Sequence, residues 1–254
     1  MKFIFGLLFL VHLSISSQDP EETGQYYQGD LELTNEQLQN LVNPVNSRNG
    51  IMNEKYRWPH RTLLYKISPE YDSAHVEYIL KAMRIIEKES CVRFKKVENP
   101  LETAYVVIQP GNQTGCHSAV GFQNKVQSVT LQTYPLDKGC FRLGTIVHEL
   151  LHSLGFYHEQ SSWDRDEFVD VLEENIQEGK EHNFRKYTKE QVTNFGIGYD
   201  YGSVLHYSAF AFSKNGEKTI LAKLPTQDIM GQRIGLSSKD ILKLRMMYKC
   251  PFYV

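Results

Sequence analysis

Residues 148–158 read HELLHSLGFYH. The apolar spacing of residues 143–154 predicts a helix that Gly155 ends. Residues four apart share a helix face, so His148 and His152 can point their imidazoles at one metal ion. Gly155 can take a positive φ, which turns the chain so that His158 approaches from another direction. Three neutral imidazoles leave one coordination position open, which predicts a catalytic zinc site rather than a structural one.

Glu149 follows the first of these histidines and can hold the metal-bound water, so it is the candidate general base. Zinc lowers the pKa of its water and polarises a scissile carbonyl. A bare HExxH occurs by chance on many helices. The glycine and the third histidine at this spacing make a metal site the favoured interpretation.

The residues that follow carry a family resemblance. Residues 158–166 read HEQSSWDRD, which resembles the extended zinc signature of the astacins, a family of metzincin zinc endopeptidases. Residues 203–207, SVLHY, resemble the Met-turn of that family. The likeness covers about residues 49–254 and implies a metalloendopeptidase with one Zn²⁺ per chain. The short chain resembles insect astacins such as seminal-fluid metalloproteases.

The resemblance also implies roles for single residues. Tyr207 matches a tyrosine that approaches the zinc as a fifth ligand and then stabilises the oxyanion. Glu159 matches the residue that receives the new N-terminal ammonium after activation, which makes Asn49 the first mature residue. A trypsin-like protease cutting after Arg48 would produce that end. Residues 128–132 match an edge strand that pairs with an extended substrate.

The first residues predict export. Residues 1–17 combine a basic start, a short apolar run and small residues, which is typical of a secretory signal peptide. The run is too short to span a bilayer comfortably, so we expect a secreted protein that is not bound to a membrane.

Four widely spaced cysteines in an oxidising compartment predict two disulfides, with three pairings open. The family resemblance implies Cys91–Cys250 and Cys116–Cys140. Asn112 begins a sequon and is a candidate glycosylation site.

Residues 18–48 predict a propeptide, with a modest helix at 34–42 ended by Pro44. Residues 27–30 read YQGD and resemble the FxGD latency motif of the family. The resemblance implies that Asp30 occupies the open position of the zinc. A carboxylate there displaces the water and blocks turnover, so activation would be the loss of this ligand.

The pattern of residues 49–254 predicts an α+β domain, and the resemblance implies the two-lobed metzincin architecture. We expect strands at 63–67, 105–108 and 126–131, with a helix from Asp72 or Ser73 and a second helix bearing HExxH. These form an N-terminal mixed sheet with two helices. A loop-rich C-terminal lobe should end in one helix that a Ser237/Asp240 capping box begins.

Two residues depart from the family pattern. Leu205 replaces the Met-turn methionine, and Ser162 replaces a usual arginine. Leucine has a similar volume, so the expected cost is below about 1.5 kcal/mol. Basic side chains of the C-terminal lobe set a preference for acidic substrate residues in astacins, and Arg233 is the candidate here.

Two alternatives to the active protease remain. A silent binding protein would normally lose a ligand or the base, and this sequence keeps them. A sister metzincin family is disfavoured by Glu159, by the DRD tripeptide and by Tyr207. A net charge of −2 disfavours nucleic acid as a partner. We therefore expect a monomer whose partners are protein or peptide substrates and an activating protease.

Overall fold

The computed structural model describes residues 19–42 and 54–251. The predicted signal peptide, the end of the predicted 34–42 helix at Pro44, the Arg48 cleavage site and the Asn49 terminus lie outside these described residues. Within them, no helix combines the length and apolar character needed to cross a membrane.

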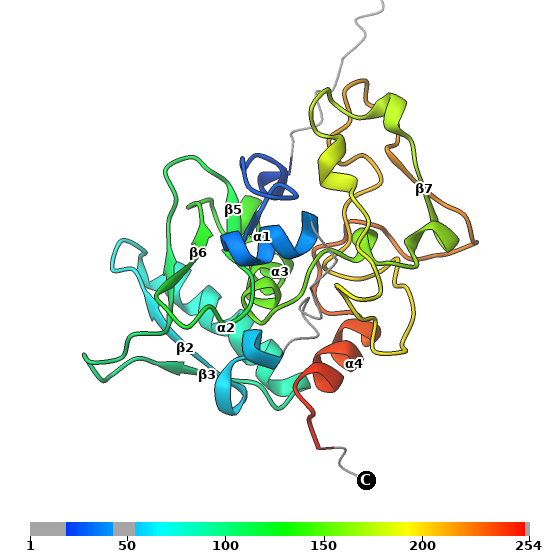
Figure 1. The fold of residues 1–254 in the computed structure, drawn as a ribbon. Coiled ribbons are helices and arrows are strands. Elements are labelled where there is room, and N and C mark those ends of the chain that lie inside the picture. The colour runs from blue at the N-terminus through cyan, green and yellow to red at the C-terminus, as the bar shows by residue number, and fades with distance from the viewer. Residues whose placement is uncertain (1–18, 43–53, 252–254) are drawn as a thin grey trace, which may run out of the picture.

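A mixed sheet of six strands forms the first half of the domain (Figure 1). Its order is β1-β5-β6-β4-β2-β3, and only β5 and β6 run antiparallel. The strands expected at 63–67, 105–108 and 126–131 correspond to β2, β4 and β6. The strands are β1 (Leu31–Glu32), β2 (Thr62–Ile67), β3 (Arg93–Lys96), β4 (Val106–Gln109), β5 (Cys116–Ala119) and β6 (Gln127–Leu131).

The expectation that residues 128–132 form an edge strand is wrong. β6 is not an edge strand, because it lies between β5 and β4. The strand beside the metal-site helix is β5, and residues 31–32 pair with it in parallel. β5 reads CHSA and is buried along its whole length, so it carries no alternating pattern that would reveal a strand.

Helices α2 (Ser73–Glu89) and α3 (Leu143–Ser153) pack against each other, and α3 also contacts β5 and β6. The Asp72 carboxylate caps α2 by accepting the His75 N–H. α3 is almost wholly buried, and Gly155, two residues after its end, has φ +108°. A Cβ there would lie 2.8 Å from the flexible end of the Met247 side chain, which can move, so the positive φ is the reason that glycine is favoured here.

The second half is loop-rich, with a small antiparallel pair of strands, β7 (Val169–Val171) and β8 (Ile220–Ala222). Its last helix, α4 (Ser238–Met247), begins with the expected Ser237/Asp240 capping box. One apolar core joins the sheet, α2, α3 and α4, while a smaller core lies within the loop-rich half. The predicted α+β architecture with two lobes is confirmed.

Residues 19–42 lie across both halves (blue in Figure 1). β1 extends the sheet on one side, and the Glu22 carboxylate accepts the Phe212 N–H, at 3.1 Å, on the other. Helix α1 (Asn35–Val42) begins after Thr34, whose hydroxyl accepts the Gln37 N–H at 3.1 Å. The segment is therefore docked by strand pairing, by side chains and by a capped helix.

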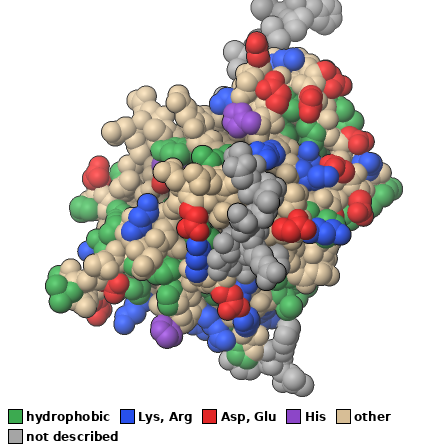
Figure 2. All heavy atoms as spheres, in the orientation of Figure 1, with side chains coloured by type: hydrophobic (Ala, Val, Ile, Leu, Met, Phe, Trp, Pro, Cys, Tyr) green, Lys and Arg blue, Asp and Glu red, His purple; other side chains and the backbone are tan. Residues whose placement is uncertain are grey.

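Acidic and basic side chains are interspersed on the face in Figure 2, without a broad area of one sign. Two disulfides join Cys91 to Cys250 and Cys116 to Cys140, the pairings that the family resemblance implies. The first closes the end of α4 onto the end of α2, and the second anchors β5.

Candidate metal centre and substrate cleft

Three histidines and one aspartate converge at the centre of the molecule. His148 and His152 project from α3, and His158 approaches from the segment after Gly155. The ligand atoms of these three and of Asp30 all lie within 4.8 Å of one another, and all four side chains are fully buried.

The hydrogen bonds of the outer nitrogens fix which way each imidazole faces. Nδ1 of His148 lies 2.7 Å from the Val204 carbonyl oxygen, and Nδ1 of His152 lies 2.8 Å from that of Phe156. Because a carbonyl only accepts, both Nδ1 atoms must carry the proton. Each Nε2 is then unprotonated, and its lone pair points towards the centre of the site.

These lone pairs would repel one another without a cation between them. The Nε2 atoms of His148 and His152 are 2.9 Å apart. Oδ2 of Asp30 lies 3.1, 3.8 and 3.3 Å from the Nε2 atoms of His148, His152 and His158. Tetrahedral ligands held about 2.0–2.1 Å from zinc lie roughly 3.3 Å apart. The four atoms therefore fit a four-coordinate zinc ion.

Burial keeps the imidazoles in the form that binds metal. It lowers the pKa of His148 to about 4 and that of His158 to about 3, and it lowers the pKa of His152 well below its usual value. Burial raises the pKa of Asp30 to about 6, although the hydrogen bond with His148 opposes the rise. At neutral pH the site thus offers three neutral nitrogens and one carboxylate.

A tight turn delivers Asp30 to the centre. Gly29 has φ +88°, and a Cβ on it would lie 2.6 Å from the Glu21 carbonyl oxygen. The preceding residue, Gln28, is wholly buried; its amide donates to Ser161, and its Oε1 lies 3.1 Å from Nδ1 of His158. Gln28 therefore orients the third imidazole, a role that sequence patterns do not signal.

Glu149 and Tyr207 lie beside the metal centre. The Glu149 carboxylate is fully buried, and neither oxygen has a hydrogen-bond partner among the described residues. Burial raises its pKa well above the usual range, and the nearby Asp30 charge adds to the effect. The Tyr207 ring lies 4.6 Å from that of His158, and its hydroxyl donates to the Gln28 carbonyl at 2.5 Å.

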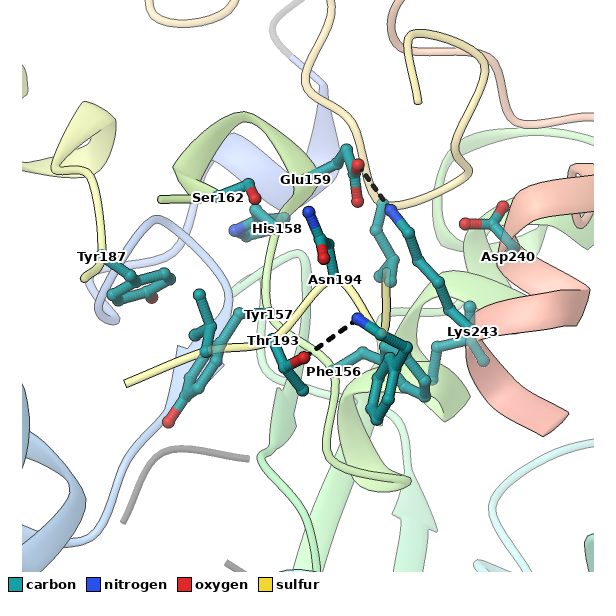
Figure 3. Close-up of a pocket in the computed structure, with 14 residues that line it drawn as sticks. Phe156, Tyr157, His158, Glu159, Ser162, Tyr187, Thr193, Asn194, Asp240 and Lys243 are labelled. Carbon is teal, nitrogen blue, oxygen red and sulfur yellow. Dashed lines mark hydrogen bonds and ion pairs between the residues drawn. The ribbon is translucent and has the colours of Figure 1, made fainter. Parts of the chain in front are cut away.

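Glu159 faces away from the metal, towards α4 (Figure 3). Its Oε1 accepts the Lys243 ammonium at 2.6 Å and the Asp200 N–H at 2.9 Å. These groups border a cavity of about 50 Å³, which Asn194 and Leu205 also line. Burial raises the pKa of Glu159 to about 7, although Lys243 lowers it in part. The lysine was not predicted, because nothing in the pattern of α4 distinguishes it from a surface residue.

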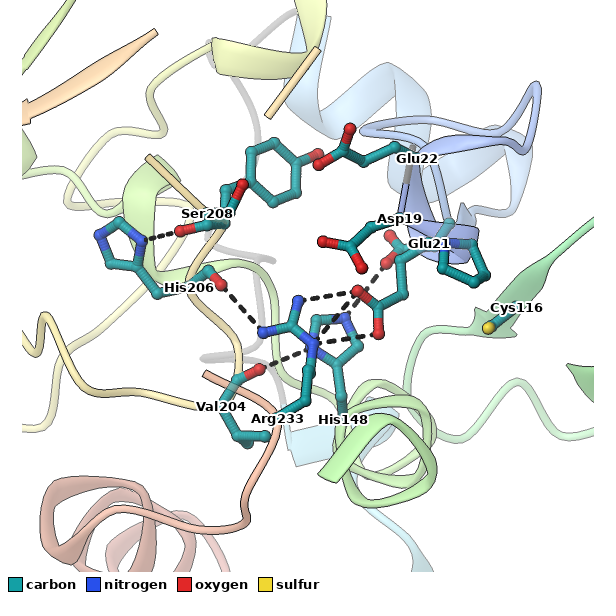
Figure 4. A network of polar contacts seen from close by, with 12 residues as sticks. Asp19, Glu21, Glu22, Cys116, His148, Val204, His206, Ser208 and Arg233 are labelled. Carbon is teal, nitrogen blue, oxygen red and sulfur yellow. Dashed lines mark hydrogen bonds and ion pairs between the residues drawn. The ribbon is translucent and has the colours of Figure 1, made fainter. Parts of the chain in front are cut away.

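The Arg233 side chain, 6% exposed, lies against the segment that contains Asp30 (Figure 4). Its guanidinium contacts both carboxylate oxygens of Glu21, with Nε–Oε1 at 3.0 Å and a second nitrogen 2.9 Å from Oε2. It also donates to the His206 carbonyl at 3.2 Å. Burial alone would raise the pKa of Glu21, but Arg233 reverses this and holds it below its usual value.

The two departures from the family pattern are locally accommodated. The Ser162 hydroxyl donates to the buried Asp164 carboxylate at 2.5 Å, and the Asn194 amide donates to its other oxygen at 2.8 Å. Together they give each oxygen of the Asp164 carboxylate a hydrogen-bond donor. Leu205 is 3% exposed and packs in the main core. Asn112 is exposed in the loop between β4 and β5.

An HExxH helix, a third histidine after a glycine turn and a carboxylate beside the first ligand together define a zinc-dependent metalloprotease of the metzincin class. Comparison with known proteins specifies the family. The model of the Astacin peptidase family matches residues 50–249. The chain belongs to the astacin family and is a zinc metalloendopeptidase.

Its relatives span several animals. Seminal metalloprotease 1 of Drosophila melanogaster is 41% identical over 99% of this chain and 98% of its own length. Human meprin A subunit beta is 36% identical over 88% of this chain but only 30% of its own length. The solved structure of high choriolytic enzyme 1, a hatching enzyme from Oryzias latipes, is 33% identical, with a TM-score of 0.68 over 77% of this chain and 94% of that one.

Proposed function

We propose that the chain is a secreted endopeptidase made as a latent precursor, in which residues 18–48 block the cleft until a trypsin-like protease cuts after Arg48. The observation that carries the proposal is the position of Asp30. Its Oδ2 lies amid three imidazole nitrogens, fully buried, where a water or a substrate carbonyl would otherwise bind. Loss of that carboxylate would open the site.

In the active enzyme, His148, His152 and His158 would hold the zinc. When bound, it supplies Lewis acidity that activates a water and polarises the scissile carbonyl. Glu149 accepts the proton of the attacking water and returns it to the leaving amine. Its buried carboxylate, which has no hydrogen-bond partner in the described part of the chain, suits this role. Tyr207 donates to the developing oxyanion. Its hydroxyl already donates to a peptide carbonyl, that of Gln28, beside the metal centre.

After activation, we propose that the ammonium group of Asn49 enters the cavity beside Glu159. Support comes from the buried Glu159 carboxylate and from the small volume that adjoins it. In the precursor the Lys243 ammonium neutralises this carboxylate, so it is not left unpaired before the new terminus arrives.

We also propose that Arg233 selects acidic substrate side chains. In the precursor its guanidinium holds a carboxylate, Glu21, through two charge-assisted contacts. Among digestive, hatching and reproductive settings, the likeness to Seminal metalloprotease 1 along nearly the whole chain favours a reproductive fluid.

The test is secretion of the full chain, followed by trypsin, with zinc content, N-terminal sequence and hydrolysis of a quenched peptide as readouts. We expect activity only after a cut before Asn49, one zinc per chain and no activity in Glu149→Ala. Asp30→Ala should release activity before trypsin, whereas Glu36→Ala, on the exposed face of α1, should not. A trimmed protein that binds zinc but cleaves no more than Glu149→Ala would identify a binding protein instead.

A further inference from the structure

A second contact between a carboxylate and a basic side chain lies on the other half of the cleft from Arg233. His117 is the second residue of β5 and is 4% exposed. Its Nδ1 lies 2.5 Å from Oε1 of Glu32. The Tyr26 ring stacks on the imidazole with centroids 4.1 Å apart. Both Tyr26 and Glu32 belong to the segment that activation would remove.

The Glu32 carboxylate also has a hydrogen-bond donor from the catalytic domain. The Ser128 hydroxyl, on β6, donates to both Glu32 oxygens, at 3.2 and 3.0 Å. Beside the carboxylate is a hollow of about 270 Å³, to whose lining Lys125 and Gln123 contribute. The carboxylate therefore sits among donors and basic groups supplied by the part of the chain that remains.

The strand register places His117 and Ser128 on the same face of the sheet. His117 is paired with Thr130, and its neighbour Ser118 points the other way, with its hydroxyl 2.8 Å from that of Ser153 on α3. Successive side chains of a strand alternate between faces. The site formed by His117 and Ser128 thus lies on the face turned away from α3, and β1 presents Glu32 to it.

We infer that His117 and Ser128 form a second subsite for an acidic side chain in the mature cleft, distinct from Arg233. A substrate strand that replaces β1 on β5 would send every second side chain to this face, and a glutamate there would meet the donors that now hold Glu32. The subsite is rigid, because the Cys116–Cys140 disulfide anchors β5 next to His117. The inference rests on the proposed removal of residues 18–48.

The activity test uses the trypsin-activated full chain and peptide substrates in which Glu or Gln is placed at each position around the cleaved bond. We expect one position, other than the one sensitive to Arg233→Gln, at which Glu is preferred over Gln by roughly fivefold in kcat/KM. His117→Gln and Ser128→Ala should reduce that preference to near one, measured within each variant as the ratio of kcat/KM for the Glu peptide to that for the Gln peptide. His60→Gln, an exposed histidine outside this hollow, is the matched control.

A binding test does not depend on turnover. A synthetic peptide of residues 19–42 is titrated by calorimetry against the trimmed Glu149→Ala protein. Glu32→Gln in the peptide should weaken binding roughly fivefold on the His117 protein and less than twofold on His117→Gln. Equal losses on both proteins, or a Glu preference that His117→Gln leaves intact, would overturn the subsite. A precursor that trypsin trims without activating would instead refute the latency proposal, and the calorimetric comparison would still decide the subsite.

Discussion

Replacing Glu21 by glutamine should weaken the binding of the N-terminal segment, residues 19–42, to the cleft. Glu21 and Arg233 form a buried pair, with side chains 3% and 6% exposed. Glutamine keeps the shape and one acceptor oxygen but removes the negative charge. The guanidinium would then be buried against neutral acceptors, namely the new amide oxygen and the carbonyls of His206 and Gln232, at 3.2 and 2.9 Å.

The magnitude follows from the burial of the pair. Truncating one partner of a buried, hydrogen-bonded charge pair costs about 2–5 kcal/mol. Glutamine retains one acceptor, so about 3 kcal/mol is the appropriate figure within that range. At about 1.4 kcal/mol for each factor of ten, inhibition by a peptide of residues 19–42 should weaken roughly 150-fold.

The assay measures the inhibition constant of that peptide against the trypsin-activated enzyme, with a substrate that lacks acidic residues. Glu36→Gln is the matched control, since Glu36 pairs with Lys55 at the surface with both side chains about half exposed. An exposed pair contributes about 0.2–1 kcal/mol, so the control should change inhibition by less than about sixfold. If Glu21→Gln behaved like the control, Arg233 would not be an anchor of latency.

Three further outcomes are expected. Burial raises the pKa of Glu22 to about 8, whereas the same carboxyl in the free peptide has a pKa near 4.5. Between these values the peptide takes up a proton when it binds. Its inhibition should therefore tighten, by at most about tenfold per pH unit, as the pH falls from 8 towards 5. Glu22→Gln should flatten that profile, and a profile unchanged by this variant would contradict the assignment. Leu205→Met should change the free energy of unfolding by less than about 1.5 kcal/mol, because the two side chains have similar volumes in this packed site; a larger change in the urea midpoint would count against it. Ser162→Ala should cost about 1 kcal/mol in the same urea titration, since Asn194 still donates to Asp164, and no loss of stability would show that the hydroxyl is dispensable.

The metal-site helix could be predicted because its signal is local. The i, i+4 spacing of His148 and His152 depends only on helix geometry, and Gly155 marks where that geometry must end. The same holds for the α4 cap, where Ser237 and Asp240 are three residues apart. In each case one element contains the whole pattern.

The partners of the site could not be predicted, because they join distant segments. Lys243 meets Glu159 across 84 residues, and Glu21 meets Arg233 across 212. Strand β5 was missed for a related reason, since it is buried on both faces and shows no alternation. Its position at the sheet edge depends on which strands pair, and a single sequence does not record that pairing.

Electrostatic contacts explain how residues 19–42 are held in the cleft. Glu21, Asp30 and Glu32 each meet a nitrogen-rich partner: a guanidinium, the imidazole cluster and the His117 ring. Each partner is held by the catalytic domain and would lose its counter-charge when the segment leaves. If residues 18–48 are removed as we propose, Arg233 and His117 would become free to accept acidic substrate side chains, while the imidazole cluster would keep the metal. On this proposal the contacts that hold the N-terminal segment in the precursor would also shape what the active enzyme prefers to cut.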